Sequence, residues 1–348
     1  MKKRVLVFCD FYLPGFRSGG GMRTVVNLVD RFCDRYDFFV FARNYDSKAD
    51  TTPYTSVITG EWNSVGNAKV FYAAAADITA GKCVAIVIEV GPDLIFLNST
   101  FSTPVVKFLM ARKKGRFSDV PVIIAPSGEL SIDALSLKPL KKKAYLAFAS
   151  VRQLYDGLIW KASSLNEADQ IKTVFGNSIR PMLGPDLAPK IILPEYSPNQ
   201  KPVKRPGIAR FVSLSRVVPI KNIRYFLELL REIGEGSVIL DIVGPLEDKK
   251  YWAECKRLID ELPDNITVNV SGALSYTEGL QRLVQSHFFV LPTLSENFGY
   301  VFIESLSAGT PILISDQTMW GAAEESGGGW SIPLEKPKAW LDAIVKCI

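Results

Sequence analysis

The feature that most limits the fold of this sequence is an alternation of short apolar runs with helical stretches, which occurs twice. In the first half the apolar runs are residues 5–8, 38–41, 70–72, 94–97 and 122–125, with helical patterns such as 22–32 and 104–112 between them. In the second half the runs are 210–214, 238–243, 266–270, 288–291 and 311–314, with helical patterns at 222–233, 251–262, 277–285 and 300–308. A polar Ser164, followed three residues later by Glu167, has capping-box spacing ahead of a helix that Gly176 would end. The rhythm predicts parallel α/β sheets with helices on both faces.

Four prolines interrupt this rhythm at a spacing of four residues: Pro194, Pro198, Pro202 and Pro206. Such a segment is neither a helix nor a central strand. We therefore predict an interdomain linker at residues 196–207, between a first domain at 1–195 and a second domain at 208–348. The 348 residues suffice for two cores. Two doubly wound domains are expected to face each other across a cleft and to bind ligand there, at the carboxyl ends of their strands.

The cysteines and the apolar stretches exclude several classes of protein. The five cysteines are odd in number and none forms a C-x-x-C pair, which argues against a disulfide framework or a zinc ribbon. Reduced cysteines in the cytoplasm are the simpler interpretation. No apolar stretch has the length of a signal-peptide core or a membrane span.

The positive charge is concentrated in the first half of the chain. Residues 1–195 hold 25 Lys and Arg against 18 Asp and Glu, whereas residues 196–348 hold 16 against 18. The excess lies in the Lys/Arg clusters at 112–116 and 138–143, the second with lysines at 138, 141, 142 and 143. Clusters of this kind favour a surface that meets anionic lipid or nucleic acid. Solvated helix ends are the alternative interpretation.

The segment from Glu296 to Glu304 is the strongest candidate for a site. An apolar strand ends, a polar turn follows, and a helix begins near Gly299. The amino terminus of that helix offers N–H groups and a positive dipole end to an anion, and Gly299 permits close approach of a phosphate. The two glutamates would be separated by about 10 Å and could bracket a diphosphate, with hydroxyl groups as their hydrogen-bond partners. An ordinary strand–turn–helix with two surface glutamates would have the same spacing.

Two further loops carry residues suited to a phosphate ligand. Arg216 and Lys221 lie between the strand at 211–214 and the helix that follows, where two cations could clamp a diphosphate. Gly19, Gly20 and Gly21 open the helix after the first strand and permit a ligand to approach the backbone. They do not match the dinucleotide fingerprint G-x-G-x-x-G, and a merely flexible loop is the alternative.

Several motifs are absent from the sequence. There is no Asp-x-Asp to clamp a diphosphate through a metal, no H-E-x-x-H and no P-loop. The single histidine, His287, lies in an apolar stretch and is interpreted as a packed residue at a strand edge. The first half therefore offers no imidazole that could deprotonate a hydroxyl group.

Together these segments resemble the family 4 glycosyltransferases with the GT-B fold, over nearly the whole chain. The most specific part is Pro292 to Glu304, which matches the E-x7-E element, continued by Ala308–Pro311 and Ser315–Trp320 in the order A-G-T-P and S-D-Q-T-M-W. Arg216 and Lys221 match the basic pair of the family, and Gly19 to Gly21 match its glycine loop. Residues 125–130, with the lysines at 141–143, are similar to the bacterial cell-surface polysaccharide branch.

The resemblance implies a role for each residue. Arg216 and Lys221 would hold the diphosphate of a UDP- or GDP-sugar, Glu296 the sugar hydroxyls and Glu304 the ribose. Groups near Asn297, Phe298 and Gly299 would complete the phosphate site. The reaction would retain anomeric configuration, need neither metal nor cofactor, and let the leaving phosphate take the proton of the acceptor. The resemblance points to a glycan or polyprenyl-linked saccharide acceptor, at the inner face of the plasma membrane, and to no nucleic acid.

Other functions are consistent with part of these observations. A retaining glycosidase needs its two carboxylates about 5 Å apart, closer than Glu296 and Glu304 are expected to be. A nucleotide-sugar epimerase shares the fold but relies on additional acids and histidines that this sequence lacks. A non-catalytic GT-B partner subunit is expected to lose its donor-site charges, and all four are present. Family members commonly end in a helix that crosses back to the first domain, whereas this sequence stops at Ile348, soon after Lys336 and Pro337, so a short last helix or a truncated chain is expected.

Overall fold

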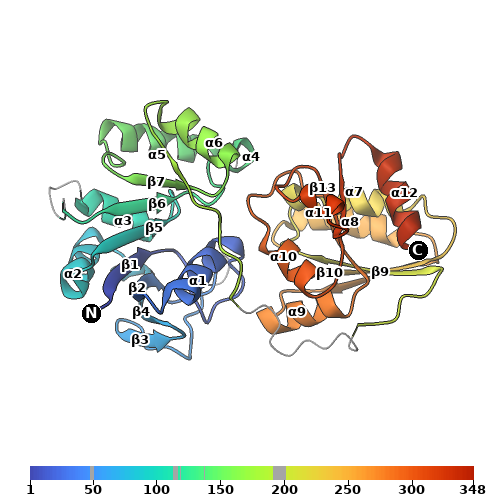
Figure 1. Cartoon of the computed structure of the whole chain (residues 1–348), viewed down its shortest axis with the longest axis horizontal. Helices are drawn as coiled ribbons and strands as arrows, with labels where there is room; N and C mark the ends of the chain where they lie inside the picture. Colours follow the sequence, from blue (N-terminus) through green and yellow to red (C-terminus); the bar gives the residue numbers. More distant parts are fainter. Residues whose placement is uncertain (48–50, 113–116, 118, 137, 191–200) are drawn as a thin grey trace. The chain divides into compact units, whose positions relative to one another are not determined.

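The chain folds into two compact units, Met1–Lys190 and Ile191–Ile348 (Figure 1). The computed structural model describes residues 1–47, 51–112, 117, 119–136, 138–190 and 201–348. Each unit is a parallel α/β sheet with helices on both faces, which confirms the fold class that the alternating pattern predicts.

The N-terminal unit is built on an eight-stranded sheet in the order β3-β4-β2-β1-β5-β6-β7-β8. Every neighbouring pair is parallel except β3 with β4. The strands are β1 (Lys3–Phe8), β2 (Tyr36–Arg43), β3 (Trp62–Val65), β4 (Ala68–Ala73), β5 (Leu94–Asn98), β6 (Val122–Ala125), β7 (Ile159–Ala162) and β8 (Met182–Leu183). The helices are α1 (Gly20–Phe32), α2 (Ala80–Val90), α3 (Thr103–Arg112), α4 (Ile132–Ser136), α5 (Pro139–Val151) and α6 (Leu165–Phe175), with a 3-10 turn η1 (Ala75–Asp77).

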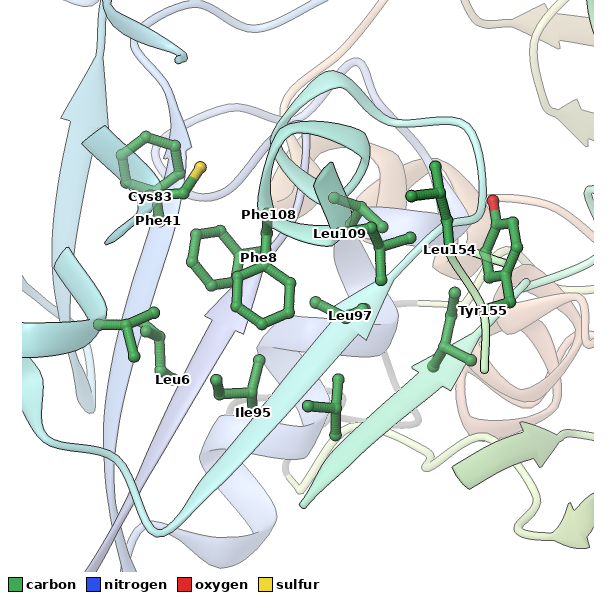
Figure 2. Packing of buried hydrophobic residues seen from close by; sticks show 14 of the residues in the cluster. Leu6, Phe8, Phe41, Cys83, Ile95, Leu97, Phe108, Leu109, Leu154 and Tyr155 are labelled. Atoms are coloured by element: carbon green, nitrogen blue, oxygen red, sulfur yellow. The ribbon is translucent and has the colours of Figure 1, made fainter. Parts of the chain in front are cut away.

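The alternation of side chains along the strands assigns these helices to two faces. Val5 and Val7 of β1 pack with α1, whereas Leu6 and Phe8 belong to the cluster that contains α2, α3, α5 and α6. Figure 2 shows this second cluster, in which the ring of Phe8 stacks on that of Phe108 at 4.9 Å. Successive residues of one strand thus fill two separate cores.

The C-terminal unit has a six-stranded sheet, parallel throughout, in the order β11-β10-β9-β12-β13-β14. The strands are β9 (Ile208–Leu214), β10 (Ser237–Val243), β11 (Ile266–Ser271), β12 (Phe288–Leu291), β13 (Ile312–Ser315) and β14 (Gly329–Ile332). The helices are α7 (Ile223–Leu230), α8 (Lys249–Asp260), α9 (Tyr276–Val284), α10 (Tyr300–Ser307), α11 (Ala322–Glu325) and α12 (Pro337–Cys347), with a 3-10 turn η3 (Pro219–Lys221). Helices α7, α8 and α12 cover one face, and α9, α10 and α11 cover the other.

Every strand predicted from the sequence is present, and the predicted helices differ only at their ends. The sequence analysis did not assign β3, β7, β8, β14, α2, α4, α5, α11 or α12. Helix α2 shows the reason: residues 84–90 are almost uniformly apolar and give no helical period. Its bounds are set by Thr79, whose side chain accepts from the backbone of Lys82 at 3.1 Å, and by Gly91 at φ 56°.

The predicted capping box at Ser164 forms only in part. Ser164 Oγ accepts from the backbone N–H of Glu167 at 3.1 Å, and Gly176 ends the helix. The Glu167 carboxylate, however, does not return to Ser164 but accepts from the backbone N–H groups of Ser163 and Gly128. The complete box lies instead at Ser275 and Glu278.

The described part of the proline segment belongs to the C-terminal unit. Residues 196–200 of the predicted linker lie outside the described residues. Lys201 donates to Thr310 Oγ1 at 2.6 Å, and the backbone N–H of Gly207 donates to Ile348 at 2.7 Å. Helix α12 also packs into this unit, where Trp340 is fully buried. Among the described residues, no helix has the length and apolar character needed to cross a bilayer.

His287 is a packed strand-edge residue, as predicted. It precedes β12, is 6% exposed, and its Nδ1 accepts from the backbone N–H of Arg210 at 3.2 Å. Burial, with the nearby charges of Lys204, Arg210 and Lys201, lowers the pKa of His287 to about 4. The folded protein therefore keeps this imidazole neutral.

We expect His287 to make the protein less stable as the pH falls. The unfolded chain takes up a proton near pH 6.5, but the folded chain does so only near pH 4, so stability present above pH 6.5 is lost between these values. Substitution His287→Asn keeps an acceptor for Arg210 and removes the titration. The fall in Tm between about pH 7 and pH 5 should be smaller in the variant; equal falls would contradict this assignment.

Gly329 offers a test of the strand pairing in the C-terminal unit. It has φ 142°, and a Cβ there would lie 1.9 Å from the carbonyl oxygen of Ile312 on β13. We expect Gly329→Ala to lower the free energy of unfolding by about 2–4 kcal/mol, measured by urea denaturation. Gly234→Ala is the matched control, because no atom lies within 4 Å of its added methyl group. Similar stabilities of the two variants would refute the described pairing.

Candidate functional site

The predicted site residues of the C-terminal unit come from loops at one edge of its sheet. Because all its strands are parallel, the loops that follow them emerge at the carboxyl edge. Strands β9 and β12 are direct neighbours, so the loop at residues 215–222 lies beside the loop at residues 292–299. Residues about 75 positions apart in the sequence are thereby brought together.

Backbone carbonyls and buried hydroxyl groups tie these two loops to each other. Thr293 is fully buried, and its Oγ1 lies 2.9 Å from the carbonyl oxygen of Ile220 and 2.8 Å from that of Ser295. The backbone N–H of Leu294 donates to the same Ile220 carbonyl at 2.8 Å. Ser315, at the end of β13, donates to the Thr293 carbonyl at 2.5 Å. The position of Lys221, next to Ile220, is therefore fixed by the loop that carries Glu296.

Lys221 and Glu296 form an ion pair through Nζ and Oε2. Their side chains are 14% and 18% exposed, so the pair is mostly shielded from water but reaches the surface. Two residues predicted separately as a phosphate cation and a hydroxyl acceptor thus contact each other directly. A ligand that touches one of them is within reach of the other.

Arg216 reaches the same edge but has a different partner. Its guanidinium lies 3.0 Å from the carboxylate of Glu247, which follows β10, and both side chains are substantially exposed. Exposed pairs of this kind contribute little, about 0–1 kcal/mol, so the pair does not lock Arg216 in place. Glu247 was missed by the sequence analysis; its position just after the strand at 238–243 was the available signal.

The amino terminus of α10 adjoins this ion pair. Gly299 precedes the helix with φ 74°, and a Cβ there would lie 2.4 Å from the ring of Phe302 and 3.1 Å from Glu296 Cγ. The glycine is thus required by its own left-handed backbone and by the packing beneath it. No side-chain hydrogen bond caps the helix, the backbone N–H of Phe302 donates to the carbonyl of Gly299 at 2.9 Å, and the positive end of the helix dipole lies at this turn.

An aromatic cluster supports the turn that leads into α10. The ring of Phe298 lies 4.8 Å from that of Tyr300 and 5.9 Å from that of Trp320. Trp320 Nε1 also donates to the Phe298 carbonyl at 2.5 Å. Phe298, 8% exposed, therefore shapes the loop, and its carbonyl is already hydrogen-bonded.

Glu304 and Asn297 lie on the same segment. Glu304 is in α10 and 5% exposed, on the buried side of the helix together with Phe302. Asn297 is half-buried in the turn next to Glu296. Their assignments to a ribose and to a phosphate stay predictions.

The glycine loop lies in the N-terminal unit. Gly19 has φ 66° with open space around it, and α1 starts at Gly20. Gly21 is fixed through its carbonyl, which accepts from Asn98 at the end of β5 at 2.8 Å. Before the glycines, Asp46 accepts from the backbone N–H groups of Phe16 and Arg17. The loop is held at both ends and open at Gly19.

Two carboxylates that the sequence analysis did not recognise as site-building residues hold the carboxyl edge of the N-terminal sheet. Glu129 accepts from Ser99 Oγ at 2.7 Å and from the backbone N–H of Thr100 at 2.6 Å. Glu167, 2% exposed, accepts from the backbone of Gly128 at 2.6 Å. Beside these contacts Ser99 has φ 100° and Ser127 has φ 53°, backbone conformations that are costly for residues other than glycine.

Two other features bear on the chemistry. Among the described residues, no group of three or more His, Cys, Asp and Glu is arranged to hold a metal ion. A pocket of about 560 Å³ lies between α5, β7 and α6, lined by Tyr155, Trp160 and Phe175 among others. It contains none of the predicted site residues, which lie on the loops described above.

Comparison with known proteins gives a family for the C-terminal part and a fold for the chain. Residues 199–348 match the family described as Glycosyl transferases group 1. No curated protein sequence is significantly similar to the chain. The similarities to solved structures extend over the chain at low sequence identity, and therefore concern the fold.

Three solved structures illustrate this likeness. Anabaena HepE in complex with UDP and glucose has a TM-score of 0.66 at 16% identity, covering 99% of this chain and 89% of HepE. Sucrose-phosphate synthase from Thermosynechococcus elongatus has a TM-score of 0.69 at 17% identity, covering 99% and 89%. WaaG, a glycosyltransferase involved in lipopolysaccharide biosynthesis, has a TM-score of 0.65 at 11% identity, covering 99% and 90%.

Residues 199–348 therefore match the glycosyl transferases group 1 family, and the chain has the GT-B fold.

Proposed function

We propose that this chain is a retaining, metal-independent glycosyltransferase of family 4. It would transfer a hexosyl-type sugar from a UDP- or GDP-sugar to a glycan or lipid-linked saccharide in the synthesis of a cell-surface polysaccharide such as O-antigen, capsule or exopolysaccharide. The observation that carries the proposal is the contact of Lys221 with Glu296 beside the uncapped amino terminus of α10. A cation, a carboxylate and a helix amino terminus at one sheet edge suit a sugar joined to a diphosphate.

The diphosphate would be bound by Lys221, Arg216 and the first N–H groups of α10. Lys221 supplies a point charge whose position is fixed by the tie between Ile220 and Thr293. Arg216 can exchange its exposed partner Glu247 for a phosphate at small cost, because a phosphate oxygen offers a stronger charge-assisted bond. That HepE was solved with UDP and with UDP-glucose supports a nucleotide-sugar donor for this fold.

The sugar would be bound by Glu296, which lies next to the Lys221 that is proposed to bind the diphosphate. A carboxylate accepts hydrogen bonds from sugar hydroxyl groups, and its pairing with Lys221 orients it. Glu304 is proposed to accept from the ribose hydroxyls, with Asn297 and the backbone at Phe298 and Gly299 beside the phosphates. Gly19, Gly20 and Gly21 are proposed to allow the donor to approach the backbone of the N-terminal unit.

The proposed reaction exchanges one bond of the anomeric carbon for another on the same face of the sugar. The bond to the donor phosphate oxygen breaks, the acceptor oxygen bonds to the carbon, and the acceptor proton passes to the departing phosphate. The negative charge that develops on the diphosphate is stabilised by Lys221, Arg216 and the helix amides. No side-chain base is needed, which agrees with a neutral, buried His287.

The acceptor and the location are proposed from a structural likeness and from the basic clusters. Likeness to WaaG, a glycosyltransferase involved in lipopolysaccharide biosynthesis, favours a saccharide acceptor. We place the reaction in the cytoplasm, at the inner face of the plasma membrane, where the Lys/Arg clusters at 112–116 and 138–143 would meet anionic lipid. Residues 113–116 of the first cluster lie outside the described residues.

The proposal is tested by offering the protein a panel of UDP- and GDP-sugars without acceptor. At least one should bind, measured by calorimetry, or be hydrolysed slowly, measured by release of the nucleoside diphosphate. Neither binding nor hydrolysis across the panel would contradict a transferase and favour a non-catalytic subunit. Release of an epimerised nucleotide-sugar would favour an epimerase.

Replacing the sugar-side carboxylate should remove transfer while leaving the fold intact. We expect Glu296→Ala, and the isosteric Glu296→Gln, to lower kcat/KM at least about a hundredfold. The control is Glu228→Ala, which removes an exposed ion pair on α7 and should have no effect. Circular dichroism should show native structure in all three. Activity of Glu296→Ala near that of wild type would eliminate the assigned role.

Chelation distinguishes a metal-free donor site from a metal-clamped one. We expect EDTA, present in excess over trace divalent ions, to leave the initial rate of transfer within about twofold of its original value. Strong inhibition that added Mg²⁺ or Mn²⁺ reverses would show that a metal ion holds the diphosphate.

A further inference from the structure

Helix α5 is drawn in green in Figure 1. One side of this helix carries a row of exposed apolar side chains. Leu140 and Val151 are 84% and 83% exposed, and Phe148 is 43% exposed. With the exposed residues Ala144 and Ala147 they follow each other at intervals of four, three, one and three positions. This spacing places all five on one side of a helix, and we call them the outer stripe of α5.

The inner side of the same helix contains polar as well as apolar residues, among them half-buried Leu146. Ala149 is buried, but beside it Tyr145 shares a hydrogen bond of 2.8 Å with Tyr155. Lys142 also turns inward, where its Nζ donates to the carbonyl of Ala134 and lies 5.1 Å from the ring of Phe101. A surface helix ordinarily presents its apolar side to the core and its polar side to water. In α5 a large part of the apolar surface faces outward instead.

Lysines border the outer stripe on both sides. At about 100° per residue, Lys141 projects next to Phe148 along one border, and Lys143 projects on the other. Both side chains are exposed, as is Lys138 just before the helix. No acidic residue occurs within Pro139–Val151, and Arg152 follows directly. An apolar row between two cationic borders is the pattern of a helix that lies in a membrane interface.

We propose that α5 lies flat on an anionic lipid bilayer, with its outer stripe among the acyl chains and Lys138, Lys141 and Lys143 at the headgroups. A helix of 13 residues is about 20 Å long, too short to span a bilayer but suited to lie on one. A second copy of the chain is a poorer occupant, because a two-fold contact between outer stripes would bring the lysines of both copies together.

This inference differs from the expectation drawn from charge alone. Of the lysines at 141–143, Lys142 is used inside the protein, so two of the three remain for lipid. Insertion of the outer stripe into the bilayer, which the charge pattern does not imply, becomes the main contribution to membrane binding. The inference does not rest on the proposed transfer reaction, because binding to lipid requires neither donor nor acceptor.

Sedimentation with vesicles tests the proposal. Wild-type protein should sediment with vesicles of phosphatidylglycerol and phosphatidylcholine, and much less with phosphatidylcholine alone. Lys141→Gln/Lys143→Gln should weaken binding roughly fivefold per lysine. Leu140→Ser/Phe148→Ser/Val151→Ser should weaken it at least about tenfold with all lysines intact.

Matched variants control for exposure and charge elsewhere. Ile88→Ser removes a side chain that is 68% exposed on α2, and Lys249→Gln/Lys250→Gln neutralises two exposed lysines on α8. Both should bind vesicles like wild type. The triple variant Leu140→Ser/Phe148→Ser/Val151→Ser is called the stripe variant. Failure of wild type to bind anionic vesicles, or unchanged binding by the stripe variant, would overturn the proposal.

Two further measurements keep the result interpretable. If the stripe variant does not fold, wild-type binding in roughly 0.5 M salt distinguishes apolar insertion from charge attraction. Insertion should leave part of the vesicle binding in place, whereas pure charge attraction should leave none. Analytical ultracentrifugation should show the same oligomeric state for wild type and stripe variant. A dimer that the stripe substitutions dissociate would assign the outer stripe to a second copy and overturn the proposal.

Discussion

The candidate site depends on the tie between two neighbouring loops at the carboxyl edge of the C-terminal sheet. The carbonyl of Ile220 accepts hydrogen bonds from the backbone of Leu294 and lies within reach of the buried Thr293 hydroxyl. This places Lys221, the last residue of η3, against Glu296, which lies in a loop. Without the tie, two opposite charges in separate loops would have no fixed geometry. The parallel pairing of β9 with β12 makes the tie possible, because it brings the ends of both strands to one edge.

Hydrogen bonds also join the loops at the carboxyl edge of the N-terminal sheet, but the acceptors are side-chain carboxylates and not a backbone carbonyl. There, Glu129 accepts a hydrogen bond from the backbone N–H of Thr100, and Glu167 accepts one from the backbone N–H of Gly128. Burial of Glu167 is offset by the donors at Ser163 and Gly128. The result is a rigid edge with residues in strained backbone conformations, Ser99 and Ser127. Strain of this kind persists where surrounding contacts fix it, and it is common at binding sites.

Helix α5 stands apart from both edges, because its outer side is more apolar than its position at the surface would suggest. The aromatic and aliphatic side chains that could have filled a core are turned toward solvent, while Lys142 and Tyr145 are turned inward. If this helix rests on lipid, the N-terminal unit would be held at the surface where a lipid-linked acceptor is available. The apolar residues and the proposed reaction would then share one location, although each has its own physical basis.

The sequence by itself determined the fold class and most of the central strands, because a repeated alternation of strand and helix periods has few solutions other than parallel α/β sheets. It also located the two loops with Lys221 and Glu296, since each follows an apolar strand. It did not pair them, and it did not find Glu247 or the roles of Glu129 and Glu167, because these contacts join residues that are distant in the chain. Only the tertiary structure decided them, through strand order and register, which place loop ends side by side. The same holds for α5: the sequence contains its lysines and its apolar residues, but which of them face solvent depends on how the helix packs against the sheet.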